Sequence, residues 1–168
     1  MIASRYAEDD VDGQEPARLA AVHAREKARE VAARSGVPQG GAVLGADTVV
    51  ALDGRLLGKP ADRDEAQRML RDLSGRRHAV LTAVCLISAG GEDAFVDEAA
   101  VTFLPLGDGH LSWYLDRGEW QGRAGGYAIQ GSGATLVERV EGDFTTVVGL
   151  PVGRLVGLLT AAGLAPWS

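Results

Sequence analysis

Residues 44–60 read LGADTVVALDGRLLGKP, and the rest of the chain is organised around them. The nearly continuous apolar run over residues 43–52 predicts a strand that is buried on both faces. The dipeptide Asp53-Gly54 is typical of a two-residue turn in a β-hairpin. Pro60, which has no N–H to donate, marks the end of the returning strand. We therefore expect an antiparallel hairpin here.

Asp47 interrupts this apolar run at a position where an unpaired carboxylate would be costly. The predicted hairpin brings Lys59 back close to Asp47 and Thr48. An acid, a hydroxyl and a cation then meet where a buried strand reaches the surface. Such an arrangement is either a structural ion pair or a functional site, and the residues alone leave both interpretations open.

The length and composition indicate one globular domain over residues 1–168. Hydrophobic residues make up 46% of the chain and charged residues 24%, and the formal net charge is −6. This charge argues against nucleic acid or an anionic membrane as a partner, although it does not exclude a local cationic pocket. The apolar stretches are too short to span a bilayer, and no signal segment is recognised. Cys85 is the only cysteine, so we expect a cytoplasmic protein without an internal disulfide.

Residues 16–33 are predicted to form a helix, because Pro16 suits a first helical turn and Gly36 follows the last one. On a 3.6-residue period, Lys27 shares a face with apolar residues. The Lys27 side chain either extends to solvent along its aliphatic stem or serves an anionic site. The acidic residues 8–12 are likewise either a solvated loop or a set of oxygen ligands for a hard cation.

Further helices and strands follow the hairpin. Asp62 and Asp108 are predicted to cap the helices that begin after them. The remaining predicted elements are strands over residues 79–88, 94–104 and 134–140 and a last helix over 151–162. The glycine-rich residues 118–133 would let backbone N–H groups approach a ligand closely, but they lack the strand–helix context of a phosphate-binding loop.

Five sequence blocks occur in order along the chain: Gly45-Ala46-Asp47-Thr48, Gly58-Lys59-Pro60, Leu73-Ser74-Gly75-Arg76 with His78, Gly125-Gly126-Tyr127-Ala128-Ile129-Gln130-Gly131, and Val148-Gly149-Leu150-Pro151. Together they resemble the Maf family of nucleoside triphosphate pyrophosphatases. The resemblance implies an α/β fold like that of inosine triphosphatases, in which helices and a curved mixed β-sheet surround a nucleotide cleft. It also implies hydrolysis of a nucleoside triphosphate to the monophosphate and pyrophosphate with a divalent cation, Mg²⁺ or Mn²⁺. A homodimer is compatible with the sequence.

The resemblance also implies roles for individual residues. The implied catalytic residues are Asp47, Lys27 and Lys59, and the implied metal ligands are Glu8 and Asp47. The implied substrate contacts are Thr48, Gln130 and Arg76. Lys27 and Lys59 are suited to bind a polyanionic triphosphate. Whether Asp47 acts as a general base, as a metal ligand or as both stays open.

The Tyr-Ala-Ile-Gln-Gly block resembles the branch of the family that acts on dTTP and UTP. The family opens with a strand and a Ser-x-Ser-Pro-Arg-Arg loop expected to hold the triphosphate, and Met1 falls after that unit. We therefore expect in-frame codons upstream of Met1 to encode such a segment, and residues 1–168 alone to hydrolyse triphosphates poorly. The alternative function is a catalytically impaired nucleotide-binding or regulatory protein.

Overall fold

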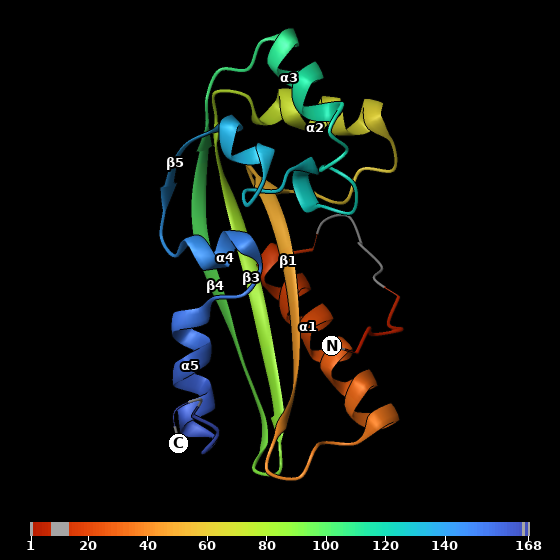
Figure 1. The fold of residues 1–168 in the computed structure, drawn as a ribbon, viewed down its shortest axis with the longest axis vertical. Coiled ribbons are helices and arrows are strands. Elements are labelled where there is room, and N and C mark those ends of the chain that lie inside the picture. The colour runs from red at the N-terminus through yellow and green to blue at the C-terminus, as the bar shows by residue number, and fades with distance from the viewer. Residues whose placement is uncertain (1, 8–13, 166, 168) are drawn as a thin grey trace.

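A five-stranded β-sheet forms the centre of the molecule (Figure 1). The computed structural model describes residues 2–7, 14–165 and 167. The strand order is β2-β1-β3-β4-β5, with bounds β1 Ala42–Leu52, β2 Arg55–Leu57, β3 Arg77–Ser88, β4 Gly91–Phe103 and β5 Val137–Glu141. Helices flank this sheet, as expected for an α/β fold. Every pair among the described strands is antiparallel, whereas a mixed sheet was expected.

The predicted hairpin is confirmed. Leu52 pairs with Arg55, so Asp53 and Gly54 form the two-residue turn between β1 and β2. Their φ angles are 51° and 78°, and two successive positive values are what a type I′ turn requires. Because β2 pairs only with Val50 to Leu52, the described sheet leaves the edge of β1 open beside residues 46–48.

Helix α1 (Pro16–Ser35) covers one face of β1 and β3, and its N-terminus is capped by the Glu15 carboxylate. Gly45 allows this helix to approach the strand unusually closely. A Cβ atom on Gly45 would lie 2.3 Å from the Ala24 carbonyl oxygen, a distance that no side chain can occupy. The backbone contact between α1 and β1 therefore depends on glycine at this position.

The main hydrophobic core lies on the other face of the sheet. Helices α2 (Arg63–Leu73) and α3 (Asp108–Leu115) gather at one end of the sheet (Figure 1). The Asp62 carboxylate accepts a hydrogen bond from the Glu65 N–H, so the prediction that it caps α2 is confirmed. The prediction for Asp108 was wrong by one position, because Gly107 occupies the N-cap and Asp108 begins α3.

The C-terminal third contains short elements that the sequence predicted only in part. Two 3₁₀ helices, η1 (Ala124–Gly126) and η2 (Ser132–Leu136), precede β5, so the strand predicted from residue 134 begins three residues later than expected. Helix α4 (Phe144–Val148) ends at Gly149, whose φ of 110° is unfavourable for other residues. Helix α5 (Val152–Ala161) follows Pro151 and matches the last predicted helix. No helix of the described part is long and apolar enough to span a membrane.

Candidate active site

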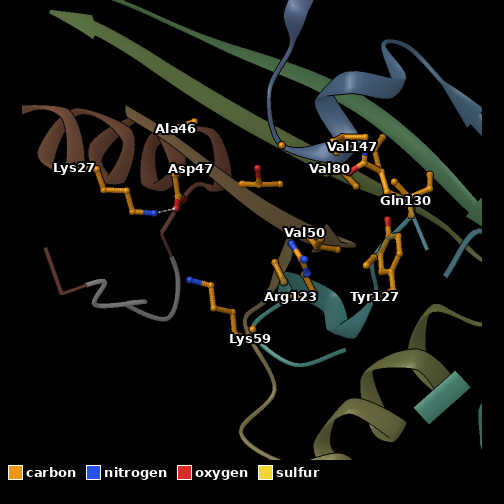
Figure 2. A pocket seen from close by; sticks show the side chains of 17 residues that line it. Lys27, Ala46, Asp47, Val50, Lys59, Val80, Arg123, Tyr127, Gln130 and Val147 are labelled. Carbon is orange, nitrogen blue, oxygen red and sulfur yellow. Dashed lines mark hydrogen bonds and ion pairs between the residues drawn. The ribbon is translucent and has the colours of Figure 1, made fainter. Parts of the chain in front are cut away.

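A pocket with a volume of about 260 Å³ lies at the open edge of β1 (Figure 2). Side chains alternate between the two faces of a strand. Asp47 therefore faces α1, while Thr48 and Val50 face α4 and the core, and at an open edge both sets can reach one space. Five of the site residues predicted from the sequence line this pocket: Lys27, Asp47, Thr48, Lys59 and Gln130.

The Asp47 carboxylate is nearly buried, with 7% of the residue exposed. Its Oδ1 atom lies 2.6 Å from the Lys27 Nζ atom, so Lys27 points inward to an acid. Its Oδ2 atom lies 3.5 Å from the Nδ1 atom of His23, which is also buried. The sequence interpretation missed His23, although its position four residues before Lys27 places both side chains on one helical face.

Further cations reach the same pocket from the opposite side. Lys59 follows β2, and Arg123 lies in the loop before η1. Figure 2 shows the charged ends of both side chains directed toward the pocket. The Gly125 N–H donates to the Gly58 carbonyl over 3.0 Å, which connects the two segments that carry these cations. The pocket is therefore locally cationic although the whole chain carries a formal charge of −6.

The donor and acceptor roles of the Thr48 hydroxyl can be assigned from its neighbours. The buried Thr82 hydroxyl donates to the Thr146 carbonyl over 2.7 Å, and its oxygen lies 2.8 Å from the Thr48 Oγ1 atom. A hydroxyl has a single proton to donate, so Thr82 must accept the hydrogen bond from Thr48. Thr48 consequently presents lone pairs to the pocket, and can accept a hydrogen bond from a ligand.

Tyr127 forms a rigid aromatic wall near Gln130 (Figure 2). Its hydroxyl lies 2.9 Å from the Nε2 atom of His78, and its ring packs edge-on against Phe103 with the centroids 4.8 Å apart. Burial raises the pKa of the Tyr127 hydroxyl and lowers the pKa of His78 to about 4. Both groups are therefore uncharged at neutral pH, and they stabilise the wall without adding charge to it.

Comparison with known proteins gives the same family as the sequence blocks. The profile of the family described as Maf-like protein matches residues 1–162. The chain belongs to the Maf family. A dTTP/UTP pyrophosphatase of Symbiobacterium thermophilum is 46% identical over 156 residues, which cover 93% of this chain and 79% of that protein. Proteins of the same name from Deinococcus radiodurans and Myxococcus xanthus are 44% and 52% identical over 165 and 145 residues, covering 98% and 86% of this chain and 83% and 72% of the relatives.

Of the other predicted site residues of this Maf protein, Arg76 lies away from the pocket. Arg76 forms an ion pair with Asp53 at the turn of the hairpin and donates to the Asp72 carbonyl. It is not among the residues that line the pocket. Glu8 lies outside the described residues, so its predicted role as a metal ligand stays a prediction.

The described residues offer one carboxylate to a metal in the pocket of this Maf protein. They contain no cluster of three or more histidine, cysteine, aspartate or glutamate side chains suited to a metal. Asp47 is the only acidic residue among those described as lining the pocket. Mg²⁺ commonly binds one or two carboxylates and takes its other ligands from substrate phosphates and water. The donor set therefore fits a cation that binds together with a phosphorylated substrate.

Proposed function

We propose that this chain hydrolyses dTTP and UTP to the nucleoside monophosphate and pyrophosphate, as the names of its relatives state for them. The observation that carries the proposal is the composition of the pocket. A buried carboxylate and three cationic side chains, those of Lys27, Lys59 and Arg123, share it with the Gln130 amide. Such a pocket suits a ligand with a polyanionic end and a polar base edge.

The cationic part of the pocket would hold the triphosphate. Charge-assisted hydrogen bonds from lysine and arginine to phosphate are about twice as strong as neutral ones. Lys27 bonds to Asp47 in this structure, and because an ammonium group carries three protons it would also donate to a phosphate oxygen. Lys59 and Arg123 would neutralise further charge from the other side of the pocket.

Asp47 would act on the attacking water. A carboxylate within hydrogen-bond reach of the water can take its proton as the water attacks phosphorus. Mg²⁺ or Mn²⁺ bound by Asp47 and the phosphates would polarise the phosphoryl oxygen and lower the pKa of bound water. The roles of base and metal ligand are compatible with the same nearly buried carboxylate.

The other part of the pocket would recognise the base. The Gln130 amide carries both a donor and an acceptor, which match the edge of a uracil or thymine ring. Val80, Val147 and Tyr127 lie around it (Figure 2) and form apolar walls. We expect these walls to leave a narrow slot that favours a pyrimidine over the larger purines.

The test is pyrophosphate release from UTP, dTTP, ATP and GTP with Mg²⁺ or Mn²⁺. We expect the two pyrimidine nucleotides to have the higher kcat/KM, which is the quantity that measures discrimination. A preference for purines would contradict the proposal. Calorimetric binding of UTP without any pyrophosphate release would instead favour a nucleotide-binding protein without catalytic activity.

A further inference from the structure

Glu119 closes the loop that carries Gln130. Its Oε2 atom accepts a hydrogen bond of 2.7 Å from the Ser132 backbone N–H, and its Oε1 atom accepts one of 2.8 Å from the Ser132 hydroxyl. Both carboxylate oxygens therefore bond to a single residue two positions after Gln130. Hydrogen bonds to an ionised acceptor are stronger and more directional than neutral ones.

The turn before Ser132 rests directly on this carboxylate. A Cβ atom on Gly131 would lie 2.2 Å from the Glu119 Oε2 atom, so any other residue there would require the Glu119 carboxylate to move. The Gly131 N–H donates to the Ala128 carbonyl over 3.2 Å and closes the turn around Gln130. The backbone on the C-terminal side of Gln130 is consequently fixed from two directions.

Glu119 itself is not among the described residues that line the pocket. We propose that Glu119 is a positioning residue for base recognition, because its contacts with Gly131 and Ser132 hold the Gln130 amide in register with the base. This inference rests on the proposed function. It concerns the part of the pocket that would recognise the base, whereas Asp47 and Lys27 belong to β1 and α1.

The hydrogen-bond donors and acceptors of the Glu119–Ser132 contact suggest two variants that separate its hydrogen bonds from its charge. Glu119→Ala removes both acceptors and leaves the loop without its anchor. Glu119→Gln keeps the shape, because the amide oxygen can accept from the Ser132 N–H while the amide N–H donates to the Ser132 hydroxyl, which can accept as well as donate. We therefore expect the two hydrogen bonds of Glu119 to matter more than its charge.

We expect Glu119→Ala to lower the ratio of kcat/KM for UTP over ATP at least ~10-fold, and Glu119→Gln to stay within about threefold of the parent ratio. Asp116→Ala is the matched control. It also removes an acid from the segment between α3 and η1, but it breaks an exposed ion pair with Arg63. We expect the control to leave the ratio unchanged. If Glu119→Ala lowered the use of UTP and ATP equally, or changed only the thermal stability, the inference would be wrong.

Two further experiments cover the cases in which Glu119→Ala does not fold or the parent chain does not hydrolyse UTP. If Glu119→Ala does not fold, Ser132→Ala removes only the hydroxyl contact, and we expect a smaller loss of the ratio, about threefold. An unchanged ratio in that variant would overturn the inference. If the parent chain binds UTP but does not hydrolyse it, the proposed function fails, and the same comparison is then made with the ratio of Kd values for UTP and ATP.

Discussion

The Lys27 Nζ atom lies 2.6 Å from the Asp47 Oδ1 atom, although the two residues belong to different elements, helix α1 and strand β1. Lys27 keeps 20% of its side chain exposed while Asp47 keeps only 6%. A carboxylate this deeply buried requires a compensating charge or hydrogen bonds. The pair therefore combines a contribution to stability with a position in the pocket where catalysis is proposed.

We expect Asp47→Asn to lower turnover at least ~100-fold, which is the usual scale for a lost general base. The fold should survive, because the variant keeps the size of the side chain and removes a buried charge. Pyrophosphate release and the thermal unfolding temperature measure the two effects. Asp116→Asn is the matched control at an exposed site, and turnover of Asp47→Asn close to that of this control would exclude Asp47 from the mechanism.

Lys27→Met should destabilise the protein by about 1–3 kcal/mol, because it removes the closest cation that the structure describes beside a buried carboxylate. Adding Asp47→Asn should restore part of that loss, since the buried charge is then gone. Denaturant unfolding of both single variants and the double variant measures the coupling. Arg18→Met, an exposed change on the same helix, controls for helix propensity. Additive effects of the two changes would contradict a direct interaction.

Gln130→Leu should lower kcat/KM for UTP and dTTP by about 10-fold or more while changing the value for ATP much less, because the pyrimidine edge loses its polar partner. Gln121→Leu is the control, since Gln121 is exposed as Gln130 is but is not among the described pocket residues. Steady-state kinetics with each nucleotide measure the difference. An equal loss for pyrimidine and purine nucleotides would remove Gln130 from base selection.

His78 should make the protein less stable in mild acid. Burial lowers its pKa to about 4 in the folded state, whereas the unfolded chain takes up a proton near pH 6.5. Because the unfolded state then binds more protons, the free energy of unfolding falls as the pH decreases from about 6.5 to 4, by about 3 kcal/mol for this group. Denaturant unfolding at several pH values should show a shallower decrease for His78→Gln. Identical pH profiles would show that His78 does not contribute.

Local signals in the sequence predicted much of the fold and part of the pocket. The β1–β2 turn, α1 and the capped start of α2 each depend on residues close together in the chain, such as Asp53-Gly54 and Asp62. Helical periodicity placed Lys27 on the apolar face of the helix but left open whether its side chain extends to solvent. Its contact with Asp47 on the neighbouring strand shows that this residue faces an acid rather than extending to solvent.

Other features depended on contacts between distant residues and could not be read from local patterns. The position of His23 beside Asp47 requires α1 to pack on β1. Arg76 belongs to a block of the family resemblance, but in the fold its guanidinium reaches Asp53 at the hairpin turn. The late start of β5 reflects the 3₁₀ helix over Ser132–Leu136, which the predicted strand over residues 134–140 did not anticipate.

The close approach of α1 to β1 at Gly45 has a consequence for catalysis. Because no Cβ atom fits between Gly45 and the Ala24 carbonyl, the separation of helix and strand is set by backbone contact. The backbone positions that carry Lys27 and Asp47 are then set when the chain folds, before any nucleotide arrives. An acid and a cation that are preorganised in this way need little reorganisation as charge develops during phosphoryl transfer.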